Sequence, residues 1–154
     1  MAIGPVAHLA NRKTALFCSA TAPTDVISNA LNAAHCMCDK GVTVISGFHS
    51  PVERACLSIL LDGKQPIIVC PARAISTMHI PDACRSAFEA GRLLFLSSFA
   101  DPPRRVDRDS ATKRNEFVAA LADEAYLPHV SPAGLTAKIA EKLAEWKVPL
   151  VTFA

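Results

Sequence analysis

Aromatic side chains are scarce in this sequence. They make up 6% of the 154 residues, with a single tryptophan and a single tyrosine. A surface that stacks nucleic-acid bases on aromatic rings is therefore not indicated, and the core must consist mainly of aliphatic residues and alanine. Hydrophobic residues nevertheless make up 51% of the chain, which is enough for one compact domain of ordinary size.

Long apolar runs and an excess of one charge are also missing. No run approaches the roughly 18 residues that a membrane-spanning helix requires, and residues 1–13 lack the continuous apolar stretch of a signal peptide. The net charge is only +2, which by itself indicates neither a nucleic-acid nor a membrane partner. We therefore expect a cytoplasmic protein with no membrane partner, whose six cysteines are reduced and mostly buried.

Short apolar runs alternate with segments of helical periodicity. The runs predict strands at residues 14–20, 42–46, 66–70, 93–97, 124–129 and 149–153. The intervening segments predict helices at residues 25–40, 51–62, 82–90 and 111–122, and a last helix that begins after Ser131. Strands that are apolar on both faces, with amphipathic helices between them, indicate a doubly wound, mostly parallel α/β sheet with helices on both faces (Rossmann-like). We expect one such domain over residues 1–154, with residues 1–13 as an N-terminal extension.

A ligand of such a sheet binds beyond the carboxyl ends of the strands. No G-x-G-x-x-G follows the first strand and no Walker A motif is present, so a dinucleotide site is not indicated. The loop SGFHS at residues 46–50 opens onto a helix N-terminus, where free N–H groups favour an anion. A second interpretation needs no ligand: Gly47 permits a tight turn, and Ser50 and Glu53 form a capping box.

The most basic stretch is residues 104–114 (RRVDRDSATKR). It holds five of the 16 basic residues, namely Arg104, Arg105, Arg108, Lys113 and Arg114. A solvated charged loop is the ordinary interpretation of such a run. Its position after the fourth strand favours an anion site. So does the expected placement of Lys113 and Arg114 in the first turn of a helix, where a cation opposes the helix dipole.

Metal ligands and a reactive thiol are not indicated. The two cysteines of HCMC at residues 35–38 diverge on a helix, and no second cluster has zinc spacing. Cys18 ends an apolar run beside the expected site, so a nucleophilic role stays open but is not favoured. His49 and His129 fall in loops that face the site, where a lone histidine is more often structural than catalytic. We expect no metal, no disulfide and no catalytic residue.

Several short segments follow one another in a recognisable order. VISG at residues 44–47 resembles V-x-S-G, and GRLLFLSSF at 91–99 resembles G-a-l-L-S-E-Y-P. KRN at 113–115, followed by FVAAL, resembles R-R-N-R-I-I-A-G-L, and AGLTAK at 133–138 is similar to S-G-T-L-I-T-A-R. These are motifs of the DprA/Smf family of DNA-processing proteins, and the resemblance covers about residues 14–153. The sequence departs from the family's S-G-x-A-R-G-I-D, because Ser50 and Pro51 replace its arginine and second glycine.

The resemblance implies a non-catalytic protein that binds single-stranded DNA or another phosphate-bearing ligand, uses no cofactor and helps to load a recombinase. A homo-oligomer stays open. The residues expected at the phosphate ligand are Ser19, Ser46, Gly47, His49, Arg114, Asn115 and Gly134. The residues expected to bind DNA are Arg104, Arg105, Arg108 and Lys113.

Two other functions remain open from the sequence. Folds related to this family include nucleotide-binding sensors and the LOG-type, lysine-decarboxylase-like phosphoribohydrolases, which use P-G-G-x-G-T-x-x-E. SPAGL at residues 131–135 is the equivalent region and has no glutamate at the required place. The first alternative is therefore nucleotide or phosphate binding without hydrolysis, and the second is a role in protein–protein assembly. Discrete anion sites favour a small ligand, whereas an extended basic groove favours DNA.

Overall fold

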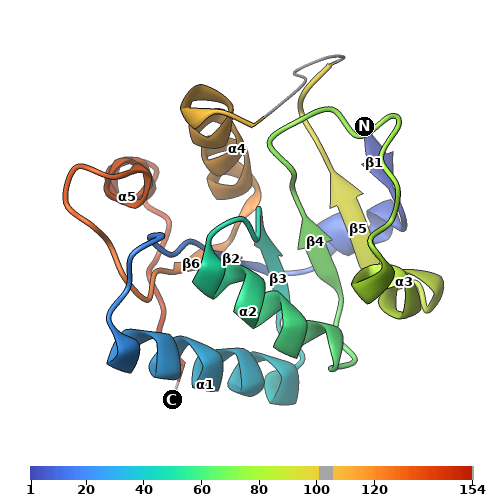
Figure 1. Cartoon of the computed structure of the whole chain (residues 1–154), viewed down its shortest axis with the longest axis horizontal. Helices are drawn as coiled ribbons and strands as arrows, with labels where there is room; N and C mark the ends of the chain where they lie inside the picture. The colour runs from blue at the N-terminus through green and yellow to red at the C-terminus, as the bar shows by residue number, and fades with distance from the viewer. Residues whose placement is uncertain (101–105, 154) are drawn as a thin grey trace.

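The computed structural model describes residues 1–100 and 106–153. Figure 1 shows the elements that these residues form. In chain order they are β1 (Ala2–Ile3), the 3-10 helix η1 (Val6–Ala10), β2 (Lys13–Leu16), α1 (Thr24–Lys40), β3 (Thr43–Ser46), α2 (Pro51–Leu61), β4 (Ile67–Val69), α3 (Asp82–Glu89), β5 (Leu93–Leu96), α4 (Arg108–Leu121), β6 (Glu124–Tyr126) and α5 (Leu135–Glu145). None of these helices is both long and apolar enough to cross a membrane.

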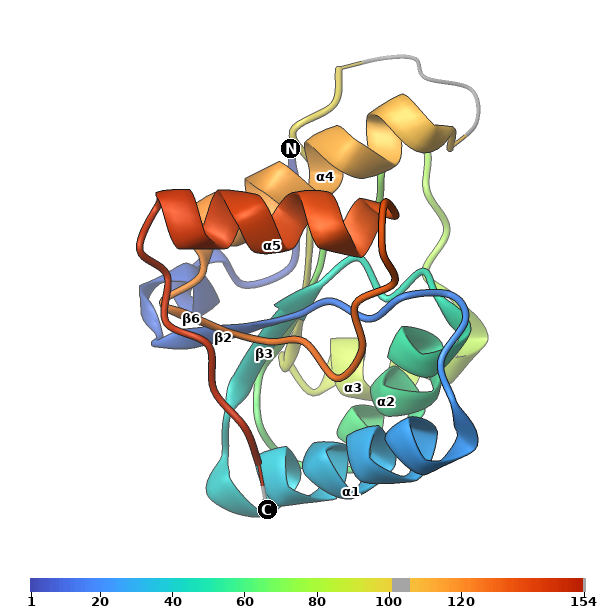
Figure 2. The ribbon, with the colours of Figure 1, turned by 90° about the vertical axis from the view of Figure 1, so that its left-hand side faces the viewer.

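The strands form one mixed sheet in the order β1-β5-β4-β3-β2-β6. All neighbouring pairs are parallel except β1, which runs antiparallel to β5. The chain proceeds from β2 to β5 toward one edge and returns through α4 to β6, on the other side of β2. The connections that leave β2 and β6 lead to opposite faces of the sheet (Figure 2). The crevice of this topological switch therefore lies beyond the carboxyl ends of β2 and β6.

Helices cover both faces of the sheet, as predicted. α1, α2 and α3 lie on one face, and α4 and α5 lie on the other (Figures 1 and 2). Val44 and Ile67 pack into the core beneath α1, α2 and α3, whereas their chain neighbours Ile45 and Ile68 pack into the core beneath α4 and α5. Successive strand residues thus enter opposite cores, which is why the strands are apolar on both faces. The predicted α/β fold class is confirmed.

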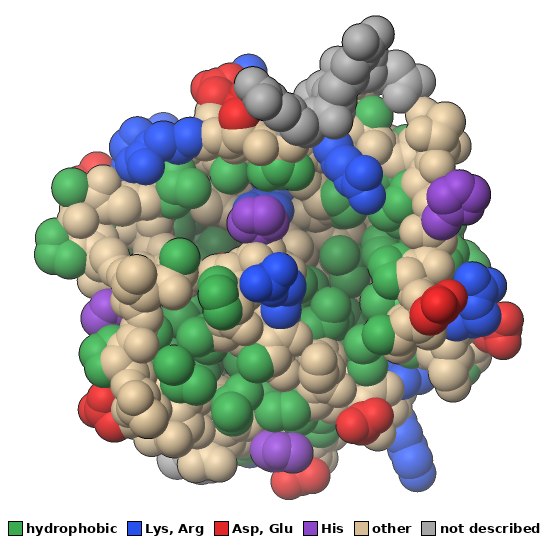
Figure 3. Space-filling model, in the orientation of Figure 1, with side chains coloured by type: hydrophobic (Ala, Val, Ile, Leu, Met, Phe, Trp, Pro, Cys, Tyr) green, Lys and Arg blue, Asp and Glu red, His purple; other side chains and the backbone are tan. Residues whose placement is uncertain are grey.

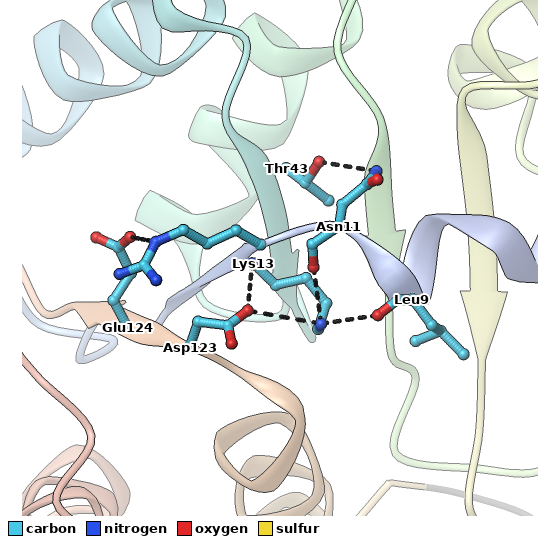
Figure 4. Close-up of polar contacts among 7 residues, drawn as sticks. Leu9, Asn11, Lys13, Thr43, Asp123 and Glu124 are labelled. Carbon is cyan, nitrogen blue, oxygen red and sulfur yellow. Dashed lines mark hydrogen bonds and ion pairs between the residues drawn. The ribbon is translucent and has the colours of Figure 1, made fainter.

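The amino ends of β2 and β6 are joined by polar contacts (Figure 4). Lys13 Nζ donates to the carbonyls of Leu9 and Asn11 at 2.9 Å each and lies 3.6 Å from Asp123 Oδ2. The backbone N–H of Lys13 donates to the same carboxylate at 2.7 Å. The ammonium group of Lys13 therefore stabilises the sheet at the end opposite the crevice, and is not a ligand contact.

The C-terminal segment differs from its prediction. Residues 149–153 do not form a strand of the sheet, because a single parallel bridge joins Leu150 to Ala125. Leu150 itself is 63% exposed. At the other end of the chain, residues 1–13 were expected as an extension, and they contribute β1 and η1.

Two helix starts were also predicted wrongly. α4 begins at Arg108, three residues before its predicted start, because the carboxylate of Asp107 accepts the backbone N–H of Ser110 at 2.8 Å in a capping box. Arg114 therefore does not lie in the first turn, and the dipole argument made for it is wrong. α5 begins at Leu135, because Gly134 and not Ser131 is the N-cap residue.

Candidate functional site

A cavity of about 470 Å³ lies at the topological switch. The loops that follow β2 and β6 line it, together with the N-terminal turns of α2 and α5 and the first two turns of α4. Figure 3 shows the hollow on the face in view, bordered by Lys or Arg and His side chains. Three helices thus present their N-terminal halves to one space, which favours a negatively charged occupant.

The N-terminus of α2 already holds an anion of the protein itself. Glu53 is 8% exposed, and its carboxylate accepts hydrogen bonds from three backbone N–H groups. Oε1 accepts from His49 at 2.9 Å and Ser50 at 3.2 Å, and Oε2 accepts from Cys18 at 2.9 Å. Ser50 completes the capping box by accepting the N–H of Glu53 at 3.4 Å. Glu53 therefore closes the end of α2 and ties it to the loop after β2.

Arg114 lies against the loop that follows β3. It is 5% exposed, and a Cβ atom on Gly47 would overlap its guanidinium group, so only glycine permits this approach. Nε donates to Asn115 Oδ1 at 2.9 Å and Nη1 donates to the Cys70 carbonyl at 3.4 Å. Nη2 forms no hydrogen bond with a described residue, and Arg114 lines the cavity. One donor group of a rigidly held arginine is therefore free for a ligand.

Burial and charge act in opposite directions on this arginine. Burial lowers the pKa of Arg114, and the Glu53 carboxylate raises it. An arginine starts from a pKa above about 12, so the guanidinium stays charged at neutral pH. The cavity thus contains a permanent, buried positive charge.

The N-terminus of α5 has no such internal anion. Its N-cap residue is Gly134, which has no side chain that could accept a hydrogen bond. The first N–H groups of α5 find no acceptor among the described residues. Thr136, in the first turn, is 7% exposed and lines the cavity, and its hydroxyl forms no hydrogen bond with a described residue. This helix end is open toward the cavity.

Ser19 joins the loops that follow β2 and β6. Its hydroxyl donates to the carbonyl of His129 at 3.1 Å and accepts the N–H of Ser131 at 2.7 Å. The backbone N–H of Ser19 donates to the same carbonyl at 3.2 Å. Ser19 lines the cavity, and its hydrogen bonds hold the α5 side of the site in place.

Two further arginines line the cavity. Arg54 and Arg108 are exposed, line the cavity, and form no side-chain hydrogen bond or ion pair with a described residue. Lys113 does not line the cavity, and its Nζ lies 3.1 Å from Asp109 Oδ2 on the outer surface of α4. Arg104 and Arg105 lie outside the described residues.

The predicted ligand residues separate into two groups. Ser19, His49, Arg114, Asn115 and Gly134 line the cavity. Ser46 and Gly47 do not, although Gly47 contacts Arg114. The hydroxyl of Ser46 is buried, donates to the Leu16 carbonyl at 2.8 Å and accepts the N–H of Phe48 at 3.0 Å, so it shapes the loop after β3.

Sequence reasoning missed two residues of this cavity. Arg54 follows Glu53 in α2. It could have been predicted from its place in the first turns of a helix that faces the site. Thr136 had no such signal, because the start of α5 was misplaced. A cation on α2 and a hydroxyl on α5 that has no partner among the described residues were thus overlooked.

Cys18, which lines the cavity, and Cys70, whose carbonyl contacts Arg114, have thiols that are poor nucleophiles. Burial, together with the Glu53 carboxylate, raises the pKa of Cys18 to about 11. Burial raises the pKa of Cys70 to about 12, against the effect of Arg114. Both thiols are protonated at neutral pH, and the thiolate is the nucleophilic form. Within the described residues, no group of three or more His, Cys, Asp and Glu side chains is arranged to hold a metal ion.

Three solved structures share the fold. DNA processing protein A from Helicobacter pylori, described for its single-stranded DNA binding mode, is similar over 97% of this chain and 68% of its own, with a TM-score of 0.77 and 18% identity. The corresponding protein (DprA) from Streptococcus pneumoniae has a TM-score of 0.77 and 14% identity over 97% of this chain, which spans 52% of that protein. The molybdenum cofactor carrier protein from Chlamydomonas reinhardtii has a TM-score of 0.58 and 13% identity, over 90% of this chain and 74% of its own.

No protein-family model and no curated protein matches the sequence. The structural likeness extends over nearly the whole chain, so the chain has a DprA-like fold. At these levels of identity the likeness establishes the fold, and the function must be argued from the cavity itself.

Proposed function

We propose that this protein binds single-stranded DNA without catalysing a reaction, with phosphate groups of the DNA in the cavity at the carboxyl ends of β2 and β6. The proposal rests on one observation. Arg54, Arg108 and Arg114 line the same cavity as the open N-terminus of α5. Guanidinium groups and helix N-termini are the protein groups that commonly hold phosphate oxygens. The DprA-like fold adds support, because the H. pylori protein is one that binds single-stranded DNA.

The lining of the cavity favours contact with phosphate over contact with bases. Phe17 is the aromatic residue of the lining and is 2% exposed, so its ring is not available as a stacking surface. Phe48, in the loop after β3, is 5% exposed and packs into the core. Binding that depends on phosphate contacts is strongly salt-dependent and nearly independent of sequence.

The absence of catalysis is part of the proposal. Both oxygens of Glu53, the carboxylate of the lining, accept backbone N–H groups, so this side chain is held in a structural role. The thiol of Cys18, with its pKa raised to about 11, is not a ready nucleophile. A role as a recombination mediator, with a recombinase as partner, is the finer part of the proposal. It comes from the family resemblance and is tested by whether this protein speeds recombinase assembly on single-stranded DNA.

A second candidate function is the binding of a nucleotide or another small phosphate ligand without hydrolysis. The size of the cavity favours it, because about 470 Å³ lies within the range of roughly 300–1,000 Å³ that is common for small-ligand sites. One of the structures that share the fold is a cofactor carrier.

Binding of a fluorescent oligothymidine at two or more salt concentrations tests the proposal. We expect binding at low salt that weakens as salt rises. In the double variant Arg54→Gln/Arg108→Gln, the slope of log K against log salt should fall by about 1.4, since each lost phosphate contact removes about 0.7 for a single strand. Arg85→Gln is the matched control, because Arg85 lies on α3 and pairs with Asp82 at 3.7 Å. Absence of binding by the unaltered protein at low salt would refute the proposal.

The same titration examines the remaining basic residues. Lys113→Gln reports whether the outer surface of α4 also contacts DNA, as the sequence predicts. The double variant Arg104→Glu/Arg105→Glu does the same for residues outside the described part of the chain. A change of slope in either variant extends the binding surface beyond the cavity.

A further inference from the structure

We infer that the cavity takes a phosphate monoester, with the open N-terminus of α5 as the seat of its dianionic phosphate. Such a group is present at a phosphorylated end of single-stranded DNA and in a free mononucleotide. The inference rests on the proposed function in that it uses the same cavity, and it adds which kind of phosphate the cavity prefers.

The first argument is an unused set of donors at the start of α5. Gly134 leaves the end of this helix without a side-chain cap, and the first N–H groups have no acceptor among the described residues. The hydroxyl of Thr136 is a second, independent observation. It belongs to a residue that is 93% buried and lines the cavity, and it forms no hydrogen bond with a described residue. The oxygen itself is not fully enclosed, because every fully buried side-chain N or O atom of the described residues has a partner. An unpaired hydroxyl with accessible surface in a residue that lines the cavity is available to a ligand oxygen.

The second argument is that the facing helix end is closed. The two oxygens of Glu53 occupy the donors at the start of α2 and the N–H of Cys18. A second phosphate could not take that place without meeting a negative charge. A continuous DNA backbone needs successive phosphate sites, and the closed end of α2 leaves the cavity with fewer of them. A ligand with one terminal phosphate needs only a single site.

The third argument is the charge of the lining. Arg54, Arg108 and Arg114 contribute three positive charges and Glu53 contributes one negative charge, so the net charge of the described lining is 3 − 1 = +2. A phosphate monoester near neutral pH carries a charge of about −1.5 to −2, whereas an internal phosphodiester carries −1. The monoester is the better electrostatic match for this cavity.

Oligonucleotides that differ only in a terminal phosphate test the inference. We would compare one oligothymidine with a 5′-phosphate, a 3′-phosphate or only hydroxyl ends, and titrate adenosine monophosphate separately by calorimetry. We expect at least one phosphorylated form to bind about tenfold tighter than the hydroxyl form, as for one or two charge-assisted hydrogen bonds. Thr136→Val keeps the shape of the side chain and should remove most of this preference. Thr152→Val, a matched change at an exposed residue far from the cavity, should leave it intact.

Each result decides one of the two proposals. Equal binding of all three oligonucleotides overturns the inference and leaves the proposed function standing. Binding of adenosine monophosphate that depends on Thr136, without binding of any oligonucleotide, supports the inference and ends the DNA proposal. No binding of any probe overturns both. A preference that Thr136→Val does not change overturns α5 as the seat of the phosphate.

Discussion

The starts of α2 and α5 face the same cavity but are in opposite states. At α2, Ser50 caps the helix and Glu53 places a carboxylate on three backbone N–H groups. At α5, Gly134 offers no cap, and the hydroxyl of Thr136 has no partner among the described residues. Both are helix N-termini at the carboxyl edge of one sheet. The position of a helix start therefore does not make it a ligand site, and what decides is whether the protein has already supplied the anion.

The closed end has a structural consequence. Glu53 on α2 reaches Cys18 in the loop after β2, and its charge lies near the buried guanidinium of Arg114. Glu53 thus stabilises the site by joining α2 to the loop after β2. The open end has no such stabilising partner in residues 1–100 and 106–153, so its donors remain available to a ligand.

The largest effect should follow removal of the internal anion. Glu53→Ala leaves three N–H groups and the Arg114 charge without their carboxylate, so we expect the free energy of unfolding to fall by about 3 kcal/mol. Urea denaturation measures this. Glu145→Ala, which removes an exposed carboxylate on α5, is the control. Added phosphate should stabilise Glu53→Ala more than the unaltered protein, because it can replace the lost carboxylate. Equal effects of phosphate on the two proteins would contradict the role assigned to Glu53.

A smaller effect should follow displacement of Arg114. In Gly47→Ala the new methyl group would overlap the guanidinium, which must then leave its contacts with Cys70 and Asn115. We expect a loss of about 1–2 kcal/mol in stability and about tenfold weaker binding of a phosphorylated oligonucleotide. Ser28→Ala is the control, because Ser28 is an exposed residue of α1 that does not line the cavity. Unchanged binding by Gly47→Ala would show that Arg114 does not contact the ligand.

Closing the open end should affect binding and hardly affect stability. Gly134→Asp gives α5 an acidic N-cap, and the extended backbone of Gly134, with φ of −87°, admits the side chain. The carboxylate would occupy the donors of α5 and repel an anion, so we expect about tenfold weaker binding of a phosphorylated oligonucleotide. The free energy of unfolding should change by only a few tenths of a kcal/mol. Retained binding would place the phosphate elsewhere in the cavity.

The smallest expected effect concerns pH and the thiols on the α2 side. Burial raises the pKa of Cys18 to about 11 and that of Cys56 to about 12. In the unfolded chain a thiol ionises near pH 8.5, so the stability contributed by each buried thiol is complete below that pH and is lost as the pH rises toward the folded pKa. Between pH 7 and pH 9 we expect a loss of about 0.8 kcal/mol for each thiol. Urea denaturation of the unaltered protein and of Cys56→Ala at both pH values measures it, with a smaller loss expected in the variant.

The general architecture could be predicted from the sequence because it depends on short-range patterns. Val44 and Ile45, like Ile67 and Ile68, are adjacent apolar residues, and only a strand covered on both faces buries both. The capping box of Ser50 and Glu53 is likewise a local spacing, and the structure contains it. The place of the cavity followed from the strand order, since ligands of such sheets bind beyond the carboxyl ends.

Local patterns were insufficient where several residues competed for one role. Ser131 and Pro132 look like a helix start, but the N–H of Ser131 is bound by the Ser19 hydroxyl, 112 residues away, and α5 begins only after Gly134. Arg114 was predicted to lie in the first turn of a helix, and it lies beyond it. Its actual environment arises because Gly47, on another connection, leaves room for the guanidinium.

The layers of the fold, the loops at the carboxyl edge and the acidic cap of α2 therefore follow from short-range sequence patterns. Which helix end is closed and which is open depends on contacts between distant parts of the chain. The reason is that hydrogen-bond satisfaction at a helix start depends on groups distant in the chain. Glu53 accepts the N–H of Cys18 across 35 residues, whereas no described residue forms a hydrogen bond with the hydroxyl of the buried Thr136.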